Sequence, residues 1–237
     1  LSKWEKCPEW KRQDLYCYWD DNCAYVENGN LVLLSEEIDG EYHMGGIRSK
    51  KKFEQAYGYF EVRCTLNTTP GYWTAFWLMG ETVANENDSG TDGTEIDIME
   101  SAYFGRGVQH TLNWDGYGQN HKVSGYIAEN SGLYDGGYHT FSLLWTEDEY
   151  IYYIDGKESW RTNAEEALGG CEVPLYMKIT AENTQAGAAS CTAQVLTHSV
   201  MLLSTIARCF FNHIGMSPLY LIYRSYLLYD ESLHQRT

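Results

Sequence analysis

The stretch Gly93-Thr94-Glu95-Ile96-Asp97-Ile98-Met99-Glu100 decides the fold, because it places three carboxylates within six residues and separates them with apolar side chains. In a β-strand successive side chains alternate between two faces, so Glu95 and Asp97 share one face while Ile96 and Ile98 share the other. In a helix residues two apart do not share a face, and the acids would be scattered. The pattern therefore predicts a strand.

The last acid of the stretch needs one further feature. Strict alternation would bring Met99 to the acidic face and turn Glu100 away from it. One extra residue, a β-bulge, restores Glu100 to the acidic side, and bulges are common where a strand re-aims a side chain beside an active site. We therefore predict a bulge before Glu100.

Three acids on one face suggest chemistry. Like charges at this density are costly, and one relief is for one acid to keep its proton. Retaining glycoside hydrolysis uses that asymmetry, since an ionised carboxylate attacks the anomeric carbon while a protonated one, about 5–5.5 Å away, protonates the leaving oxygen. From spacing alone two alternatives, a solvated acidic edge strand and a cation site, together have the same weight as this catalytic interpretation.

The stretch GTEIDIME resembles the catalytic signature of glycoside hydrolase family 16, in the branch that has one extra residue before the last glutamate. Laminarinases and their agarase and carrageenase relatives have that form. The resemblance runs in order from roughly Ser2 to Glu182. Four other segments carry it: GGIRSK at 45–50, YGYFEVR at 57–63, GYWTAFWLMG at 71–80 and YHTFSLLWTEDEYIYYIDGK at 138–157.

The resemblance implies an all-β fold, a jelly-roll sandwich of two curved antiparallel sheets of the concanavalin type, with a cleft on the concave face. We assign residues 1–182 to this catalytic domain. Family members begin some residues earlier than Leu1, so we expect the domain to be incomplete at its N-terminus. Residues 183–237 do not resemble the family's ending, and we expect an atypical tail, frame-shifted or divergent, in place of the closing strand.

The resemblance also implies roles for the acids. Glu95 is expected to be the nucleophile, Glu100 the acid/base, and Asp97 a hydrogen-bond partner of the nucleophile. The implied reaction is retaining endo-hydrolysis of β-1,3- or mixed β-1,3/1,4-glucan by double displacement. A galactan hydrolase of the agar or carrageenan type is the alternative within the family. A non-catalytic β-glucan-binding module shares the fold and is the alternative from another class.

Candidate substrate contacts begin with two tryptophans. Trp73 and Trp77 lie on one face of the predicted strand 72–79, and aromatic planes can pack on the apolar faces of sugar rings. Core packing is the alternative, and Trp73 is favoured for the cleft because it is nearer the strand entry. In the family the segment 45–50 enters the substrate groove, which makes Arg48 a candidate ligand; a surface salt bridge is an equal alternative.

The next predicted strand, 108–114, follows the acidic one and contributes three further candidates from the resemblance: His110, Asn113 and Trp114. Alternation places Asn113 on one face of this strand and both His110 and Trp114 on the other. The family often has His where Asn113 stands, which weakens the transfer to that position. For His110 a structural role is an equal alternative.

Composition bounds the partners. The 237 residues have a formal net charge of −16, which argues against nucleic acid, whose phosphates require basic patches. Tyr, Trp and Phe make up 15% of the chain, which suits a groove for flat ligands as well as a core. We expect a monomer that binds a β-glucan polysaccharide or oligosaccharide. No apolar run reaches the ~20 residues of a membrane span, so we expect no membrane partner.

The seven cysteines are an odd number, so no complete set of disulfides is possible within one chain. They lack metal-finger spacing, and most are expected to be buried thiols, although one bridge among Cys7, Cys17 and Cys23 is conceivable. We predict no cofactor and no metal ligands; a structural calcium is not readable from the sequence. The chain shows no signal peptide, whereas the resemblance implies a secreted or cell-surface protein.

Overall fold

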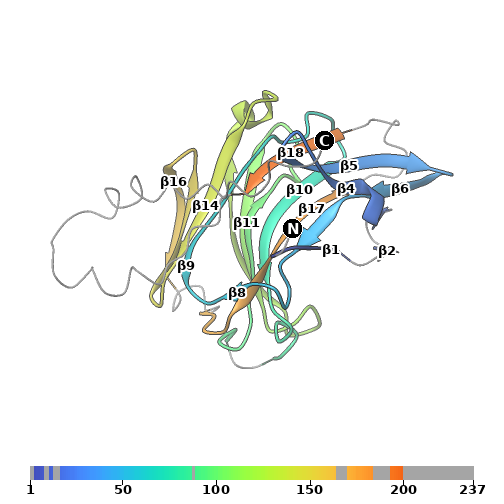
Figure 1. Ribbon diagram of the computed structural model, residues 1–237. Coiled ribbons are helices and arrows are strands. Elements are labelled where there is room, and N and C mark those ends of the chain that lie inside the picture. The colour runs from blue at the N-terminus through green and yellow to red at the C-terminus, as the bar shows by residue number, and fades with distance from the viewer. Residues whose placement is uncertain are drawn as a thin grey trace. The chain divides into compact units, whose positions relative to one another are not determined.

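The computed structural model describes residues 3–7, 11–12, 17–86, 89–163, 170–183 and 193–199, all within one compact unit, Leu1–Met201. This unit is a sandwich of two curved β-sheets (Figure 1). Its strands pair antiparallel throughout the described residues except for one parallel pair, β3 with β6. The all-β jelly-roll prediction is confirmed.

The first sheet carries the acidic strand β11 in its interior. Eight described strands form it, and all of them come from residues before 184. In spatial order they are β1 (Glu5–Lys6), β7 (Gly46–Arg48), β17 (Leu175–Asn183), β10 (Tyr72–Met79), β11 (Glu95–Glu100), β12 (Gly107–Trp114) and β13 (Lys122–Glu129), with β8 (Glu54–Gln55) paired to β17.

The second sheet has ten described strands. In spatial order they are β16 (Lys157–Asn163), β15 (Glu149–Ile154), β14 (His139–Trp145), β9 (Gly58–Cys64), β18 (Ala193–Ser199), β5 (Asn30–Ile38), β6 (Glu41–Met44), β3 (Cys17–Trp19) and β2 (Lys11–Arg12), with β4 (Ala24–Glu27) paired to β5. Two short 3₁₀ helices, η1 (Asp21–Cys23) and η2 (Ser131–Tyr134), connect strands.

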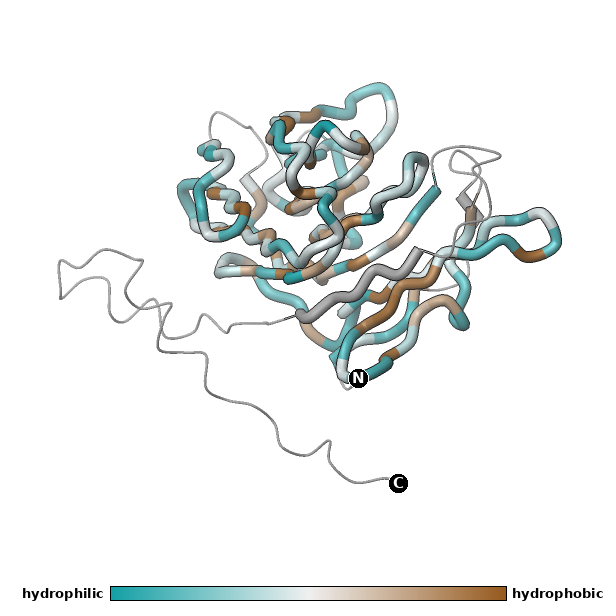
Figure 2. The backbone as a smooth tube through the Cα atoms, turned by 90° about the horizontal axis from the view of Figure 1, so that it is seen from above, coloured by the Kyte–Doolittle hydropathy of each residue, from teal (hydrophilic) through white to brown (hydrophobic). Residues whose placement is uncertain are grey.

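The main core lies between the two sheets. Alternation along β11 and β12 sends Ile96, Ile98 and Leu112 into it, and the second sheet contributes side chains such as Phe141 and Tyr152. All five are fully buried. Hydrophobic positions recur along the strands, whereas most turns are hydrophilic (Figure 2). The face of the first sheet that is turned away from this core is called the outer face below.

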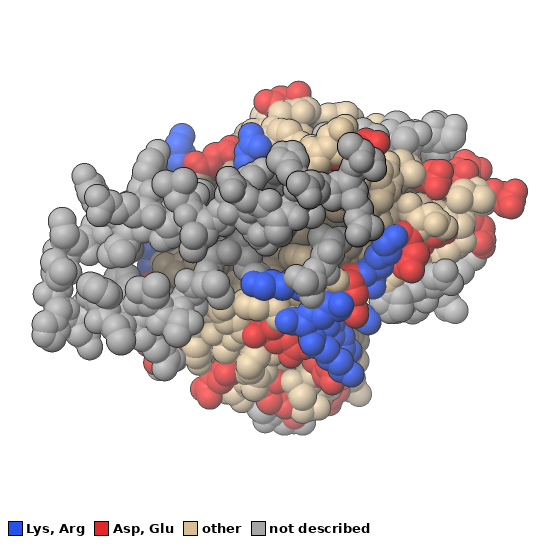
Figure 3. All heavy atoms as spheres, in the orientation of Figure 1, with Lys and Arg blue, Asp and Glu red and all other residues tan. Residues whose placement is uncertain are grey.

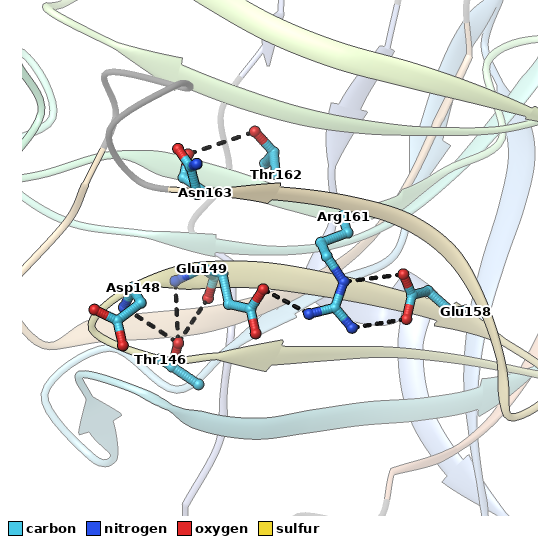
Figure 4. A network of polar contacts seen from close by, with 7 residues as sticks. All are labelled: Thr146, Asp148, Glu149, Glu158, Arg161, Thr162 and Asn163. Atoms are coloured by element: carbon cyan, nitrogen blue, oxygen red, sulfur yellow. Dashed lines mark hydrogen bonds and ion pairs between the residues drawn. The ribbon is translucent and has the colours of Figure 1, made fainter.

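The hairpin of β15 and β16 is secured by ion pairs. The guanidinium of Arg161 on β16 lies 2.6 Å from Glu149 on β15 and 2.8 Å from Glu158 on its own strand (Figure 4). Thr146 closes the turn before β15 by accepting hydrogen bonds from the backbone of Asp148 and Glu149. Both strands belong to the second sheet, which does not carry β11.

Part of the predicted tail is a strand. β18 pairs with β5 on one side and β9 on the other, so it occupies an interior place in the second sheet. The first sheet, which we expected to lack its closing strand, contains no strand from residues 184–237 among those described. The remaining residues of the tail lie outside the described residues.

The conceivable bridge among the N-terminal cysteines is not formed: Cys7, Cys17 and Cys23 are buried thiols. Cys17 accepts a hydrogen bond from the Asn183 backbone at 3.4 Å, and Cys23 donates one to Glu36 at 3.6 Å. Cys7 packs in a second, smaller hydrophobic cluster. No described helix has the length and apolarity needed to cross a membrane.

Candidate active site

The acidic strand β11 contains the predicted bulge. Its pairing with β12 places Asp97 opposite Thr111 and Glu100 opposite Gln109, which is a step of three residues on β11 against two on β12. The pairing with β10 shifts at the same place. The two residues that stand opposite His110, Ile98 and Met99, are both buried in the core. Glu100 therefore returns to the outer face with Glu95 and Asp97.

An amide on the neighbouring strand joins two of the acids. The side-chain nitrogen of Asn113 donates to Asp97 Oδ2 at 2.9 Å and to Glu95 Oε1 at 3.2 Å. Thr111 donates to Glu100 Oε2 over a longer distance of 3.4 Å. The predicted site residues Glu95, Asp97, Glu100 and Asn113 are thus brought together.

Burial and like charge act on Asp97, which is only 4% exposed. Its pKa is raised well above the usual value, first by burial and then by the neighbouring carboxylates of Glu100, Glu95 and Glu182; the hydrogen bond from Asn113 opposes the shift. Burial and the neighbouring carboxylates therefore both favour the protonated form of Asp97. A protonated Asp97 removes one negative charge from beside Glu95.

A loop that the sequence analysis did not select supplies a further contact. Asp115 and Gly116 both adopt positive φ, 57° and 74°, and turn the chain back after β12. The Tyr117 hydroxyl then donates to Glu95 Oε2 at 2.6 Å. Its pKa is raised by burial and by Glu95, so the hydroxyl stays a donor. An Asp-Gly turn signal was visible in the sequence, but the reach of Tyr117 to Glu95 was not.

The same loop holds the bridging amide. His121 Nε2 lies 3.1 Å from Asn113 Oδ1, and the Tyr117 and His121 rings are 5.7 Å apart. If Oδ1 accepts from His121, the amide NH₂ of Asn113 must face the two carboxylates. The loop therefore fixes both oxygens of Glu95, one through Tyr117 and one through Asn113.

Both predicted tryptophans of β10 lie on the outer face, in register with residues of the site. Trp77 stands opposite Asp97 on one side and Lys178 on the other, and Trp73 stands opposite Glu182. Trp77 is 8% exposed and its indole nitrogen donates to Thr180 at 3.1 Å. Trp73 is partly exposed. Trp73 is thus the more exposed of the two, and its contact with a ligand stays a prediction.

An ammonium covers the buried indole. Lys178 Nζ lies 3.8 Å from the Trp77 ring centre and 4.3 Å from that of Trp19, and burial lowers the lysine pKa to about 8. Arg48 is its cross-strand neighbour on β7 and forms an ion pair with Glu5 at 2.7 Å. The salt-bridge alternative for Arg48 is thus present, and its contact with substrate stays a prediction.

Two predicted substrate contacts are corrected. His110 and Trp114 lie on the opposite face of β12 from Asn113, are 0% and 4% exposed, and face the core between the sheets. Side chains buried between two sheets cannot touch a polysaccharide on the outer face. Alternation had separated them from Asn113, but it did not say which face would be covered.

Within the described residues no group of three or more His, Cys, Asp or Glu side chains is arranged to hold a metal ion. The expectation that the chain needs no cofactor stays a prediction. On the face drawn in Figure 3, Lys and Arg atoms gather in one area that Asp and Glu atoms border. The expected lack of a nucleic-acid partner also stays a prediction.

The fold and site define a class: a jelly-roll sandwich with a bulged, carboxylate-bearing strand inside one sheet. The family model of glycosyl hydrolases family 16 matches residues 11–195. The chain therefore belongs to glycosyl hydrolases family 16. The match runs past residue 182 and reaches the third residue of β18.

Three similar proteins illustrate the family. An endo-1,3-1,4-beta-glycanase of Rhizobium meliloti (strain 1021) is 30% identical over 65% of this chain and 32% of its own length. A keratan-sulfate endo-1,4-beta-galactosidase of Sphingobacterium multivorum is 29% identical over 65% of this chain and 38% of its own. The solved family 16 enzyme of Bacteroides ovatus, in complex with a mixed-linkage glucan product, superposes with a TM-score of 0.70 at 21% identity, covering 84% of this chain and 95% of that chain. The chain thus spans about a third of the length of the two curated relatives.

Proposed function

We propose that this chain is a retaining, endo-acting glycoside hydrolase that cleaves β-1,3- or mixed β-1,3/1,4-glucan by double displacement. The observation that carries the proposal is the bulged strand β11, which presents Glu95, Asp97 and Glu100 together on the outer face. A solvated edge strand would not explain it, because β11 pairs on both sides and Asp97 is buried.

In the first step Glu95 attacks the anomeric carbon while Glu100 gives its proton to the leaving glycosidic oxygen. Tyr117 and Asn113 each donate to the Glu95 carboxylate, and these donors favour its ionised form and hold its orientation. The raised pKa of Asp97 favours its protonated form, which adds no charge beside the nucleophile.

In the second step a water molecule attacks the anomeric carbon of the glycosyl-enzyme. Glu100, now ionised, takes the proton of that water, and Glu95 leaves as a carboxylate. Two inversions at one carbon retain the β configuration. Acids carried by one strand face favour this two-step route, because the single-displacement route needs space for a water molecule between them.

The substrate class is supported by relatives. The glycanase of Rhizobium meliloti is named for 1,3-1,4-β linkages, and the Bacteroides ovatus structure holds a mixed-linkage glucan product. Trp73 on the outer face offers an aromatic surface for a sugar ring. An extracellular location and a monomeric state complete the proposal.

A galactan is the second candidate, and two observations favour it. The relative of Sphingobacterium multivorum is named for keratan sulfate. The outer face also carries two neighbouring basic side chains, Arg48 and Lys178. Glu5 and Glu182 offset their charge, so we rank glucan first.

Incubation of the chain with laminarin, lichenan, agarose and keratan sulfate, followed by reducing-sugar assay, tests the function. Release from laminarin or lichenan is expected. Binding without release would indicate a glucan-binding module instead. Proton NMR of the earliest product tests the mechanism, and an initial α-anomer signal would contradict double displacement.

A further inference from the structure

The position of Glu100 depends on the bulge in β11. Ile98 and Met99 together stand opposite the single residue His110, between the pairs Asp97–Thr111 and Glu100–Gln109. A slip of one residue turns every following side chain of a strand to the other face. Loss of the bulge would therefore turn Glu100 toward the core.

The His110 side chain bonds the bulge directly. Its Nδ1 lies 2.7 Å from the carbonyl oxygen of Ile98, and its Nε2 lies 2.7 Å from Ser159 Oγ. A carbonyl can only accept, so Nδ1 carries the hydrogen. In the neutral ring Nε2 is then the acceptor, and the Ser159 hydroxyl donates to it. Both partners together select one tautomer.

The second sheet anchors this imidazole. Ser159 occupies a bulge of its own, because the pairing of β15 with β16 shifts between Tyr152–Trp160 and Tyr153–Glu158. Tyr152 and Trp160 also pack on the ring, with centroids 4.7 Å and 6.5 Å from it. Their strands are tied together by Arg161 (Figure 4). His110 thus bridges a bulge in one sheet to a bulge in the other.

We propose that His110 is a positioning residue: its Nδ1–H holds the Ile98 carbonyl, keeps the bulge in register and so aims Glu100 at the glycosidic oxygen. This inference rests on the proposed function for its catalytic consequence. Its structural part, the retention of the bulge by His110, stands on the contacts alone. On the sequence alone, His110 is equally open as a substrate contact and as a structural residue; in this proposal it acts from behind the sheet.

A matched pair of substitutions separates the two bonds of the imidazole. The amide nitrogen of His110→Asn can take the place of Nδ1, so this variant keeps a donor for Ile98 and loses the bond to Ser159. His110→Gln places its amide near Nε2 and loses the donor for Ile98. Ser159→Ala is the matched control, since it removes the distal partner of the imidazole and leaves the donor for Ile98 in place. It also removes the longer hydrogen bond, 3.4 Å, from Ser159 to the Tyr152 carbonyl.

On laminarin we expect His110→Gln to lower kcat by about 100-fold, with little change in KM. This is the order of loss that results when a catalytic group is displaced by about 1 Å. His110→Asn and Ser159→Ala should lose clearly less. On an aryl glucoside with a good leaving group, kcat/KM reports a first step that needs no acid. On this substrate the kcat/KM of His110→Gln should be close to that of the wild type. The proposal would be overturned if His110→Gln lost activity equally on both substrates. It would also be overturned if His110→Asn and His110→Gln lost activity equally on laminarin.

Amide hydrogen exchange over residues 97–100 gives a readout that needs no turnover. Exchange should be faster in His110→Gln than in Ser159→Ala or the wild type. Unchanged exchange would show that His110 does not hold the bulge in place. If the wild type cleaved no glucan, the proposed function would fail, but hydrogen exchange would still test whether His110 holds the bulge in place. Should His110→Gln not fold, the double variant His110→Asn/Ser159→Ala is the test. A folded protein with wild-type exchange would support the proposal that the donor to Ile98 holds the bulge, and rapid exchange would contradict it.

Discussion

Acid should destabilise this protein through His110. Burial lowers the pKa of this histidine from 6.5 to about 4, and the hydrogen bond to Ile98 offsets only part of the shift. The groups packed on the ring, Tyr152, Ser159 and Trp160, offer no carboxylate to stabilise an imidazolium. Below pH 6.5 His110 is protonated in the unfolded chain, whereas in the folded protein it stays neutral until the pH approaches 4.

The sign and size follow from linkage. Because the unfolded state binds more protons between the two pKa values, the free energy of unfolding falls as pH falls through that window. A shift from 6.5 to about 4 corresponds to about 3 kcal/mol lost between pH 7 and pH 4. That is a large fraction of the 5–15 kcal/mol by which domains are typically stable.

Two other groups, Asp97 and His139, also have shifted pKa values, and their contributions to the pH dependence must be removed by comparison. Asp97 has a raised pKa and works in the opposite direction, since the folded protein takes up its proton first. His139 also has a raised pKa, owing to Asp155 and Asp135, and its contribution is lost as pH rises. Both groups remain in His110→Asn, so the difference between the two proteins isolates position 110.

Urea unfolding of the wild type and His110→Asn at pH 7, 6, 5 and 4 is the assay. The stability advantage of the wild type should shrink by about 3 kcal/mol across this series. Coincident fluorescence and circular dichroism transitions would establish two-state behaviour at each pH. A difference that stays constant with pH would show that His110 titrates normally, and the reasoning from its burial would be wrong.

Glu95→Gln and Glu100→Gln should each abolish most hydrolysis with an unchanged melting temperature, yet kcat/KM on an activated aryl glucoside should survive only in Glu100→Gln; identical behaviour there would contradict the roles. Tyr117→Phe removes a charge-assisted hydrogen bond of about 1.5–3 kcal/mol from Glu95, so the acidic limb of its pH–activity profile should move to higher pH, and an unmoved limb would deny the contact a role. Trp73→Ala should weaken kcat/KM by about 1–2 kcal/mol in stacking more than it lowers Tm. A large drop in Tm with normal kinetics would indicate that Trp73 is a core-packing residue and does not contact the substrate.

Much of the fold and of the candidate site could be predicted from local pattern. The strand 72–79 has the predicted bounds, and the bulge before Glu100 is present where alternation required it. These features depend on the period of two along a strand, which neighbouring residues set by themselves. Tyr117 could not be predicted, because its contact with Glu95 depends on how a loop folds back over strands distant in sequence.

The sequence by itself determined which side chains share a face: three acids on β11, Asn113 apart from His110 and Trp114, and Trp73 with Trp77. Only the tertiary structure decided which face is covered. Packing of the second sheet buries His110 and Trp114 behind the acids and leaves Asn113 beside them. The physical reason is that alternation is a property of one strand, whereas burial depends on what packs against it, and that comes from residues 40 to 50 positions further along the chain.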